Sequence, residues 1–234
     1  NNGNFVLRVA KPVPILQQVG QFTVTQRGYD AVQEKLKNYV DAIDKSGEYG
    51  QALQGFIDEF GLPAIHQLIL KHTVQGHAGS WNQVARALKL GFSETSTMEE
   101  RAAVLLHELY HSRTSDLAGL YEKSKGLKQL LYKGKDRDVK TSLTPEALTP
   151  EISQAFDNLV ECKAEVLKYL EENPEIKEAL LSTDVTTNFN KRPLYALLAE
   201  TNKYGVREFI SEIYTNSAFI QLLKSIPTKV EKQS

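Results

Sequence analysis

Cysteine is almost absent from this chain, because Cys162 is the only one among 234 residues. A disulfide within the chain is therefore excluded, and a zinc site built from cysteines is not expected. Any bound metal has to be held by histidine and carboxylate side chains. The lack of disulfides fits a reducing compartment, and it fits equally well a protein that is delivered across a membrane.

The chain also lacks an excess of positive or of negative side chains. The chain has 28 Lys and Arg against 29 Asp and Glu, which gives a formal net charge of −1. No general attraction to nucleic acid or to an anionic membrane follows from this balance. No stretch approaches the roughly 18 apolar residues of a membrane span, and no signal peptide is visible in this piece. The localisation stays open, since a cytoplasmic, a phage-injected and a secreted protein are all compatible with these features.

The spacing of apolar residues predicts an α+β fold that is predominantly helical and contains a small mixed sheet. Residues 1–25 contain β-branched side chains and two prolines, which favours short strands or an extended arm. Residues 84–92 alternate in character and are compatible with a half-exposed strand, although a helix is also tolerated there. Loops are expected over residues 73–81 and 126–149. Helices are expected over residues 28–60 in two pieces, 64–72, 152–170, 174–181, 195–202 and 207–226.

A further helix is predicted just after a polar segment, where Ser96 or Thr97 can act as the N-cap. Glu99 and Glu100 favour the positive end of the helix dipole, and an apolar run follows from residue 102. This helix carries the most informative residues of the chain.

The motif His-Glu-x-x-His occupies residues 107–111 of that helix. Residues four apart lie one turn above each other, so His107 and His111 can converge on one ion. Glu108 is displaced by about 100° around the helix, within reach of a water bound to that ion. A chance match of this short pattern is the alternative, but the capped helix and the strand candidate before it favour a zinc site with Glu108 as catalytic base.

A catalytic zinc site needs a third protein ligand and one open position. Glu208 and Glu212 are also four residues apart, among apolar residues of a predicted helix. Buried acids are costly unless they are paired or bind a metal. We therefore expect Glu208 to be the third ligand and Glu212 to orient a ligating histidine from outside the ligand shell. Two ordinary acids on a solvated face are the alternative.

Three segments together resemble a known family. They are His-Glu-Leu-Tyr-His at 107–111, Ser-Asp-Leu-Ala-Gly-Leu-Tyr at 115–121 and Glu-Phe-Ile-Ser-Glu-Ile-Tyr at 208–214. They look like the catalytic domain of anthrax toxin lethal factor, a zincin metallopeptidase. They are also similar to the metallopeptidase-like domains of polyvalent proteins of phages and plasmids. The resemblance covers residues 84–121 and 195–219 only.

The resemblance implies His107, His111 and Glu208 as zinc ligands, Glu108 as the base and Glu212 as the outer acid. It also implies a tyrosine shortly before the ligand glutamate that stabilises the oxyanion. Tyr204 is the nearest candidate, but it lies only four residues before Glu208, closer than in lethal factor. The other candidates are Tyr195 and Tyr214.

The resemblance also suggests how the chain is organised. Residues 1–82 would form a mostly helical region packed on a zincin-like domain at 83–226, with a helical insert at about 126–193 and a frayed tail at 227–234. Zincins bind an extended peptide along an edge strand beside the active-site helix. We expect residues 84–92 to be that strand, with an ordinary core strand as the alternative.

The leading functional hypothesis is a zinc endopeptidase that hydrolyses a peptide or protein substrate with a metal-bound water activated by Glu108. A different class of function is also compatible with the sequence. In that case the chain is a phage structural or ejected protein whose zincin-like domain serves as a binding module. A secreted toxin that cleaves host proteins is a third biological setting for the same chemistry. The sequence indicates neither the cleavage specificity nor the oligomeric state.

Overall fold

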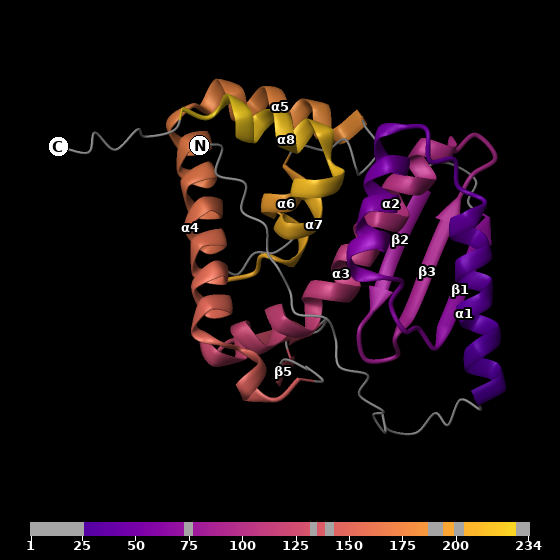
Figure 1. Ribbon diagram of the computed structural model, residues 1–234. Coiled ribbons are helices and arrows are strands. Elements are labelled where there is room, and N and C mark those ends of the chain that lie inside the picture. The colour runs from indigo at the N-terminus through magenta and orange to yellow at the C-terminus, as the bar shows by residue number, and fades with distance from the viewer. Residues whose placement is uncertain are drawn as a thin grey trace.

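The computed structural model describes residues 26–72, 77–131, 135–138, 143–186, 194–198 and 204–227. The expected extended arm at residues 1–25 lies outside this part. The described chain forms two halves that share one long helix, α3 (Met98–Ser124), which runs from one half into the other (Figure 1). Most of the described residues are helical and one small sheet is mixed, so the α+β, predominantly helical class is confirmed.

The first half contains the sheet and two helices, α1 (Gln26–Asp41) and α2 (Glu48–Phe60). The strands are β1 (Gln67–His72), β2 (His77–Asn82) and β3 (Ala87–Phe92), and their order is β1-β3-β2. β1 runs parallel to β3, and β2 runs antiparallel to it. The boundary expected between residues 82 and 83 therefore falls between two strands of the same sheet.

Two local predictions in this half are wrong. Residues 64–72 were expected to be helical, but residues 67–72 form β1. The loop expected at 73–81 contains most of β2. The pairing of strands in the sheet explains both differences. Leu68 and Leu70 lie opposite Leu88 and Leu90 in the parallel register. The sequence pattern of residues 64–72 by itself does not reveal such a partner.

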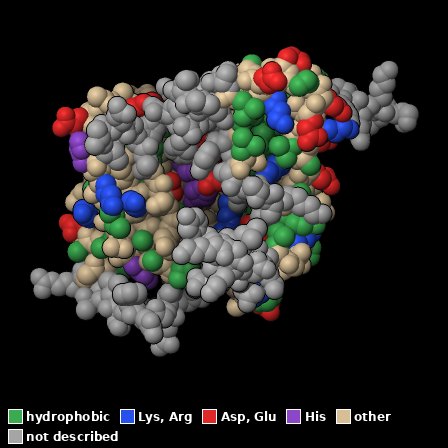
Figure 2. All heavy atoms as spheres, turned by 180° about the vertical axis from the view of Figure 1, so that it is seen from behind, with side chains coloured by type: hydrophobic (Ala, Val, Ile, Leu, Met, Phe, Trp, Pro, Cys, Tyr) green, Lys and Arg blue, Asp and Glu red, His purple; other side chains and the backbone are tan. Residues whose placement is uncertain are grey.

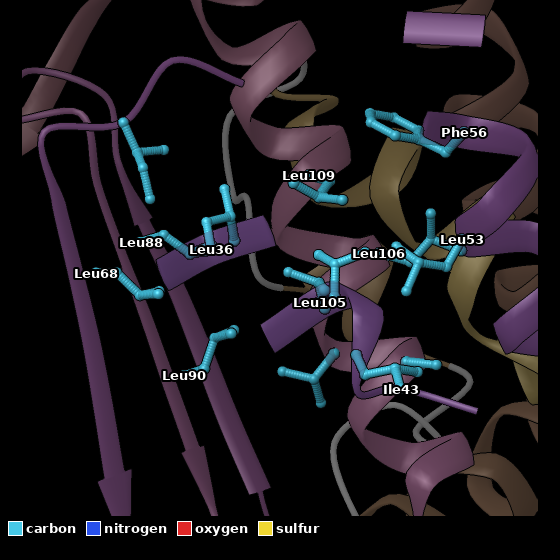
Figure 3. Packing of buried hydrophobic residues seen from close by; sticks show 14 of the residues in the cluster. Leu36, Ile43, Leu53, Phe56, Leu68, Leu88, Leu90, Leu105, Leu106 and Leu109 are labelled. Carbon is cyan, nitrogen blue, oxygen red and sulfur yellow. The ribbon is translucent and has the colours of Figure 1, made fainter. Parts of the chain in front are cut away.

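One face of the sheet is covered by helices, and the first core lies in between (Figure 3). Leu68, Leu88 and Leu90 point from the strands toward side chains of α1, α2 and α3. The opposite face is polar where β3 exposes Lys89. The apolar residues at the N-terminal end of α3 that complete this core are Ala102, Val104, Leu105, Leu106 and Leu109.

Helix α3 begins where the sequence predicts. Thr97 is its N-cap, and its hydroxyl accepts a hydrogen bond from the Glu100 backbone N–H at 3.1 Å. The Glu100 carboxylate in turn accepts a hydrogen bond from the Thr97 N–H at 2.9 Å, which completes a capping box. At 27 residues the helix is about 40 Å long, and this length lets it take part in both cores.

The second half begins with a β-hairpin, β4 (Lys128–Leu131) and β5 (Lys135–Asp138), and a 3-10 turn at Pro145–Ala147. The loop expected at 126–149 is thus partly regular structure. Five helices follow: α4 (Pro150–Glu172), α5 (Pro174–Thr186), α6 (Tyr195–Leu198), α7 (Arg207–Thr215) and α8 (Ser217–Ser225).

The single helix expected over 207–226 is wrong, because Asn216 divides it into α7 and α8. The Asn216 side chain accepts a hydrogen bond from the Phe219 N–H at 3.0 Å and so caps α8. This break turns α8 away and leaves α7 as a short helix packed along α3.

The second core lies between the C-terminal part of α3 and the helices that follow. It includes Leu117, Tyr121, Phe156, Phe209 and Phe219. No described helix combines the length and apolar character that a membrane crossing needs.

Candidate metal centre

The two histidines of the motif lie on the buried face of α3, where the first core ends and the second begins. His107 is 3% exposed and His111 is 9% exposed. Their rings meet edge to face, and the two Nε2 atoms are 3.0 Å apart. One turn of helix therefore brings the two imidazole nitrogens together, as the spacing predicts.

Helix α7 places a carboxylate against both nitrogens. Glu208 lies in the first turn of α7, and its two oxygens are 3.3 Å from His107 Nε2 and 3.3 Å from His111 Nε2. One ligand atom from each of the three residues can be chosen so that all lie within 4.8 Å of one another. The structure thus brings together residues 97 positions apart in the sequence, as counted from 111 to 208.

These three residues could hold a metal ion. Two atoms that each lie about 2.0–2.1 Å from a tetrahedral ion are roughly 3.3 Å apart, close to the separations observed here. Burial lowers the pKa of His107. Burial opposes ionisation of Glu208, but hydrogen bonds with His107 and His111 hold the pKa of that carboxyl below its usual range. Neutral imidazoles and an ionised carboxylate are the forms that bind a metal.

Glu108 lies beside this group but faces the sheet. It is 3% exposed, and burial raises the pKa of its carboxyl to about 7. A backbone hydrogen bond from Trp81 of β2 holds one side of the carboxylate. The Oε2 atom is buried and has no hydrogen-bond partner among the described residues. An unpaired buried carboxylate oxygen next to three metal-binding groups is a costly arrangement that a bound water or substrate would relieve.

The other ring nitrogen of His107 points into α7. The Thr215 hydroxyl donates to the Ser211 carbonyl at 2.8 Å, so its oxygen is left to accept from His107 Nδ1 at 3.1 Å. Glu212, which is fully buried, lies 3.4 Å from the same nitrogen. With a metal bound, these two acceptors would hold the proton on Nδ1 and leave the Nε2 lone pair for the ion.

Two further contacts fix α7 on its neighbours. The Arg207 guanidinium donates twice to the Glu122 carboxylate of α3, at 2.7 and 3.2 Å. The buried Lys163 ammonium of α4 donates to the Gly205 carbonyl at 2.7 Å. Both contacts hold the start of α7, next to Glu208, in place.

The candidate tyrosines are placed differently. Tyr204 is half-buried before α7, and its ring lies edge to face with Tyr121 at 6.4 Å. Tyr214 is stacked on Tyr110 at 4.4 Å. The Tyr195 side chain lies outside the described part of the chain. The oxyanion role of Tyr204 stays a prediction.

The edge-strand expectation for residues 84–92 is wrong. Residues 87–92 form β3, which is the central strand of the described sheet. The strand that packs along α3 at Glu108 is β2, an edge strand. From behind, histidine and acidic side chains meet in a hollow near the middle of the molecule (Figure 2).

Sequence reasoning missed Thr215, Arg207, Glu122, Lys163 and Gly79 as neighbours of the site. For two of them the helical spacing could have indicated a place near the site. Thr215 is one turn after Ser211 and seven residues after Glu208, and Glu122 is three turns after His111.

Comparison with known proteins identifies no relative. No family model, no curated protein and no solved structure matches this chain.

Proposed function

We propose that this chain is a zinc-dependent endopeptidase with a zincin-like fold. The observation that carries the proposal is the convergence of His107 Nε2, His111 Nε2 and a Glu208 oxygen beside the buried carboxylate of Glu108. The resemblance of the three segments to the lethal factor catalytic domain and to phage metallopeptidase-like domains supports it. Three protein ligands also leave one of the four positions of a zinc ion open.

The residues around the ion have separable tasks in this proposal. His107, His111 and Glu208 would hold zinc, which when bound polarises the scissile carbonyl and acidifies a water molecule. Glu108 would take a proton from the attacking water as its oxygen bonds to the carbonyl carbon. Glu108 would then give that proton to the amine as the C–N bond breaks. Thr215 and Glu212 would keep the His107 ring in the ligating tautomer.

The edge strand β2 suits an extended peptide. Its outer side faces no other described strand, and its inner side packs against α3 at Glu108. A peptide paired with the β2 backbone would pass directly over the metal centre. This arrangement supports a peptide or protein substrate, and it moves the substrate-binding role from residues 84–92 to β2.

Two measurements test the proposal. Elemental analysis of the purified protein should find one zinc per chain, and a mixed peptide library should be cleaved. Glu108→Gln should retain the zinc while hydrolysis falls by about 10²–10⁴-fold, because it removes the proton acceptor and leaves the ligands. A protein that takes up no zinc contradicts the proposal. Zinc uptake without any cleavage would favour a binding module instead.

A further inference from the structure

Gly79 is the residue of β2 that lies directly against Glu108. In the antiparallel register it pairs with Leu90, so both residues face the helices. A Cβ added to Gly79 would lie 2.7 Å from Glu108 Cγ and 2.8 Å from Glu108 Cδ. Real Cβ atoms essentially never come so close to carbon, so one of the two groups would have to move.

Glu108 has little room in which to move. Its side chain is 3% exposed, and its neighbours on α3 belong to the tightly packed first core. The conflict involves Cγ, near the root of the side chain, so a rotation of the distal carboxylate alone does not remove it. The Trp81 backbone hydrogen bond, two residues along β2, would also be strained if the carboxylate shifted.

We infer that Gly79 is a positioning residue whose missing side chain gives the Glu108 carboxylate its place between β2 and the metal centre. A Cβ at this position displaces Glu108, because its three nearest atoms all belong to Glu108 and none to His107, His111 or Glu208. The steric part of this inference stands on the packing alone. Its catalytic consequence rests on the proposed function, in which Glu108 moves the proton.

Two other glycines provide matched controls. At Gly55 in α2 an added Cβ meets nothing within 4 Å. At Gly47 it would lie 2.7 Å from Glu99 Cδ, but these are the distal atoms of a half-buried side chain, which can swing away at the cost of the hydrogen bond that Tyr49 N–H donates to Glu99 Oε1. Replacing glycine by alanine usually stabilises a protein where space and backbone permit. The inference therefore predicts that Gly79→Ala destabilises the protein instead.

The first test uses thermal unfolding of the metal-free full chain and needs no activity. Gly79→Ala should lower the melting temperature by roughly 3–8 °C, as overpacking of a core does. Gly55→Ala should raise it slightly, and Gly47→Ala should lower it by less than Gly79→Ala does. In the Glu108→Ala background, the loss caused by Gly79→Ala should disappear. An equal loss in both backgrounds overturns the inference. If Gly79→Ala alone fails to fold, the double variant should fold, and its failure also overturns the inference.

The second test uses hydrolysis by the zinc-loaded protein. Gly79→Ala should lower kcat by about 10²-fold, with zinc content and KM nearly unchanged, because only the proton acceptor is displaced. In a Glu108→Ala background, which lacks both Cγ and the proton acceptor, Gly79→Ala should lower the residual kcat little further. Loss of zinc, or an equal kcat loss in both backgrounds, overturns the positioning role. A wild-type protein without hydrolysis refutes the proposed function and leaves the unfolding test of Gly79 valid.

Discussion

The two halves of the molecule supply different parts of the candidate centre. The first half, built on the sheet and α2, surrounds Glu108 with Gly79 and the Trp81 backbone. The second half, built on α4 to α8, brings Glu208, Glu212 and Thr215 to the histidines. Only α3 belongs to both. In the proposed function, metal binding and proton transfer would therefore depend on separate packing surfaces, so that each could be damaged without the other.

The largest effect is expected from removing a ligand that α3 presents to the second half. His111→Ala should weaken zinc binding by about 10²–10⁴-fold, since one of three protein ligands is lost from a site of roughly 10–16 kcal/mol. Competition with a chromogenic chelator measures this affinity. His72→Ala, at an exposed histidine of β1, is the control and should leave it unchanged. Equal affinities for both variants would refute the ligand assignment.

A second prediction compares the two cores. Leu90→Ala in the first core and Phe219→Ala in the second should each lower the free energy of unfolding by about 2–5 kcal/mol. Both residues are fully buried. Because α3 takes part in both cores, we expect one cooperative transition in thermal unfolding monitored by circular dichroism. Two separate transitions would show that the halves unfold independently and would weaken the role given to α3.

A third prediction concerns the contact that orients His107. Thr215→Val keeps the side-chain shape but removes the oxygen that accepts from Nδ1, so zinc affinity should fall about 10–100-fold. Thr215→Ser keeps the oxygen and should stay within a few-fold of the wild type. The same chelator competition measures both variants. If valine and serine behave alike, Glu212 alone orients the ring.

The smallest effect is expected far from the centre, at Asp157 of α4. Hydrogen bonds from Lys125 and then from the Tyr121 hydroxyl, both at 2.7 Å, lower the pKa of this carboxyl below its ordinary 3.8. A carboxyl whose pKa is lowered by folding stabilises the fold at pH values above its pKa in the unfolded chain. This contribution is lost as the pH falls through its pKa in the folded protein. Asp157→Asn should therefore cost about 0.5–1 kcal/mol at pH 7 and progressively less below pH ~4, in urea unfolding at several pH values. A cost that does not change with pH would contradict this.

The features that depend on a few neighbouring residues were predicted correctly from the sequence. The capping box at Thr97 and the pairing of His107 with His111 depend on residues three or four apart, so the sequence displays them directly. Glu208 was inferred from the need for a third ligand and from its spacing to Glu212, and the structure places it beside both histidines. The resemblance to a family implied the same residues that helical spacing and the need for a third ligand had already indicated.

The pairing of the strands was not predicted. Residues 64–72 carry apolar side chains that suit a helix, yet the parallel partner at β3 makes residues 67–72 a strand. Residues 77–82 contain Gly79 and Asn82, both poor strand formers, and their pairing with β3 outweighs that preference. The edge-strand role was given to the wrong segment for this reason, because strand order depends on the whole sheet.

The separation of the ligands along the chain has a consequence for the time at which the site is completed. His107 and His111 leave the ribosome 97 residues before Glu208, as counted from position 111. At about 5–20 residues per second, this interval lasts roughly 5–20 s. During that time the histidine pair lacks its carboxylate and the Thr215 contact, so a zinc ion bound as proposed would be held weakly. In the proposed function, high-affinity capture of the metal would thus be a late event of synthesis, coupled to the docking of α7 on α3.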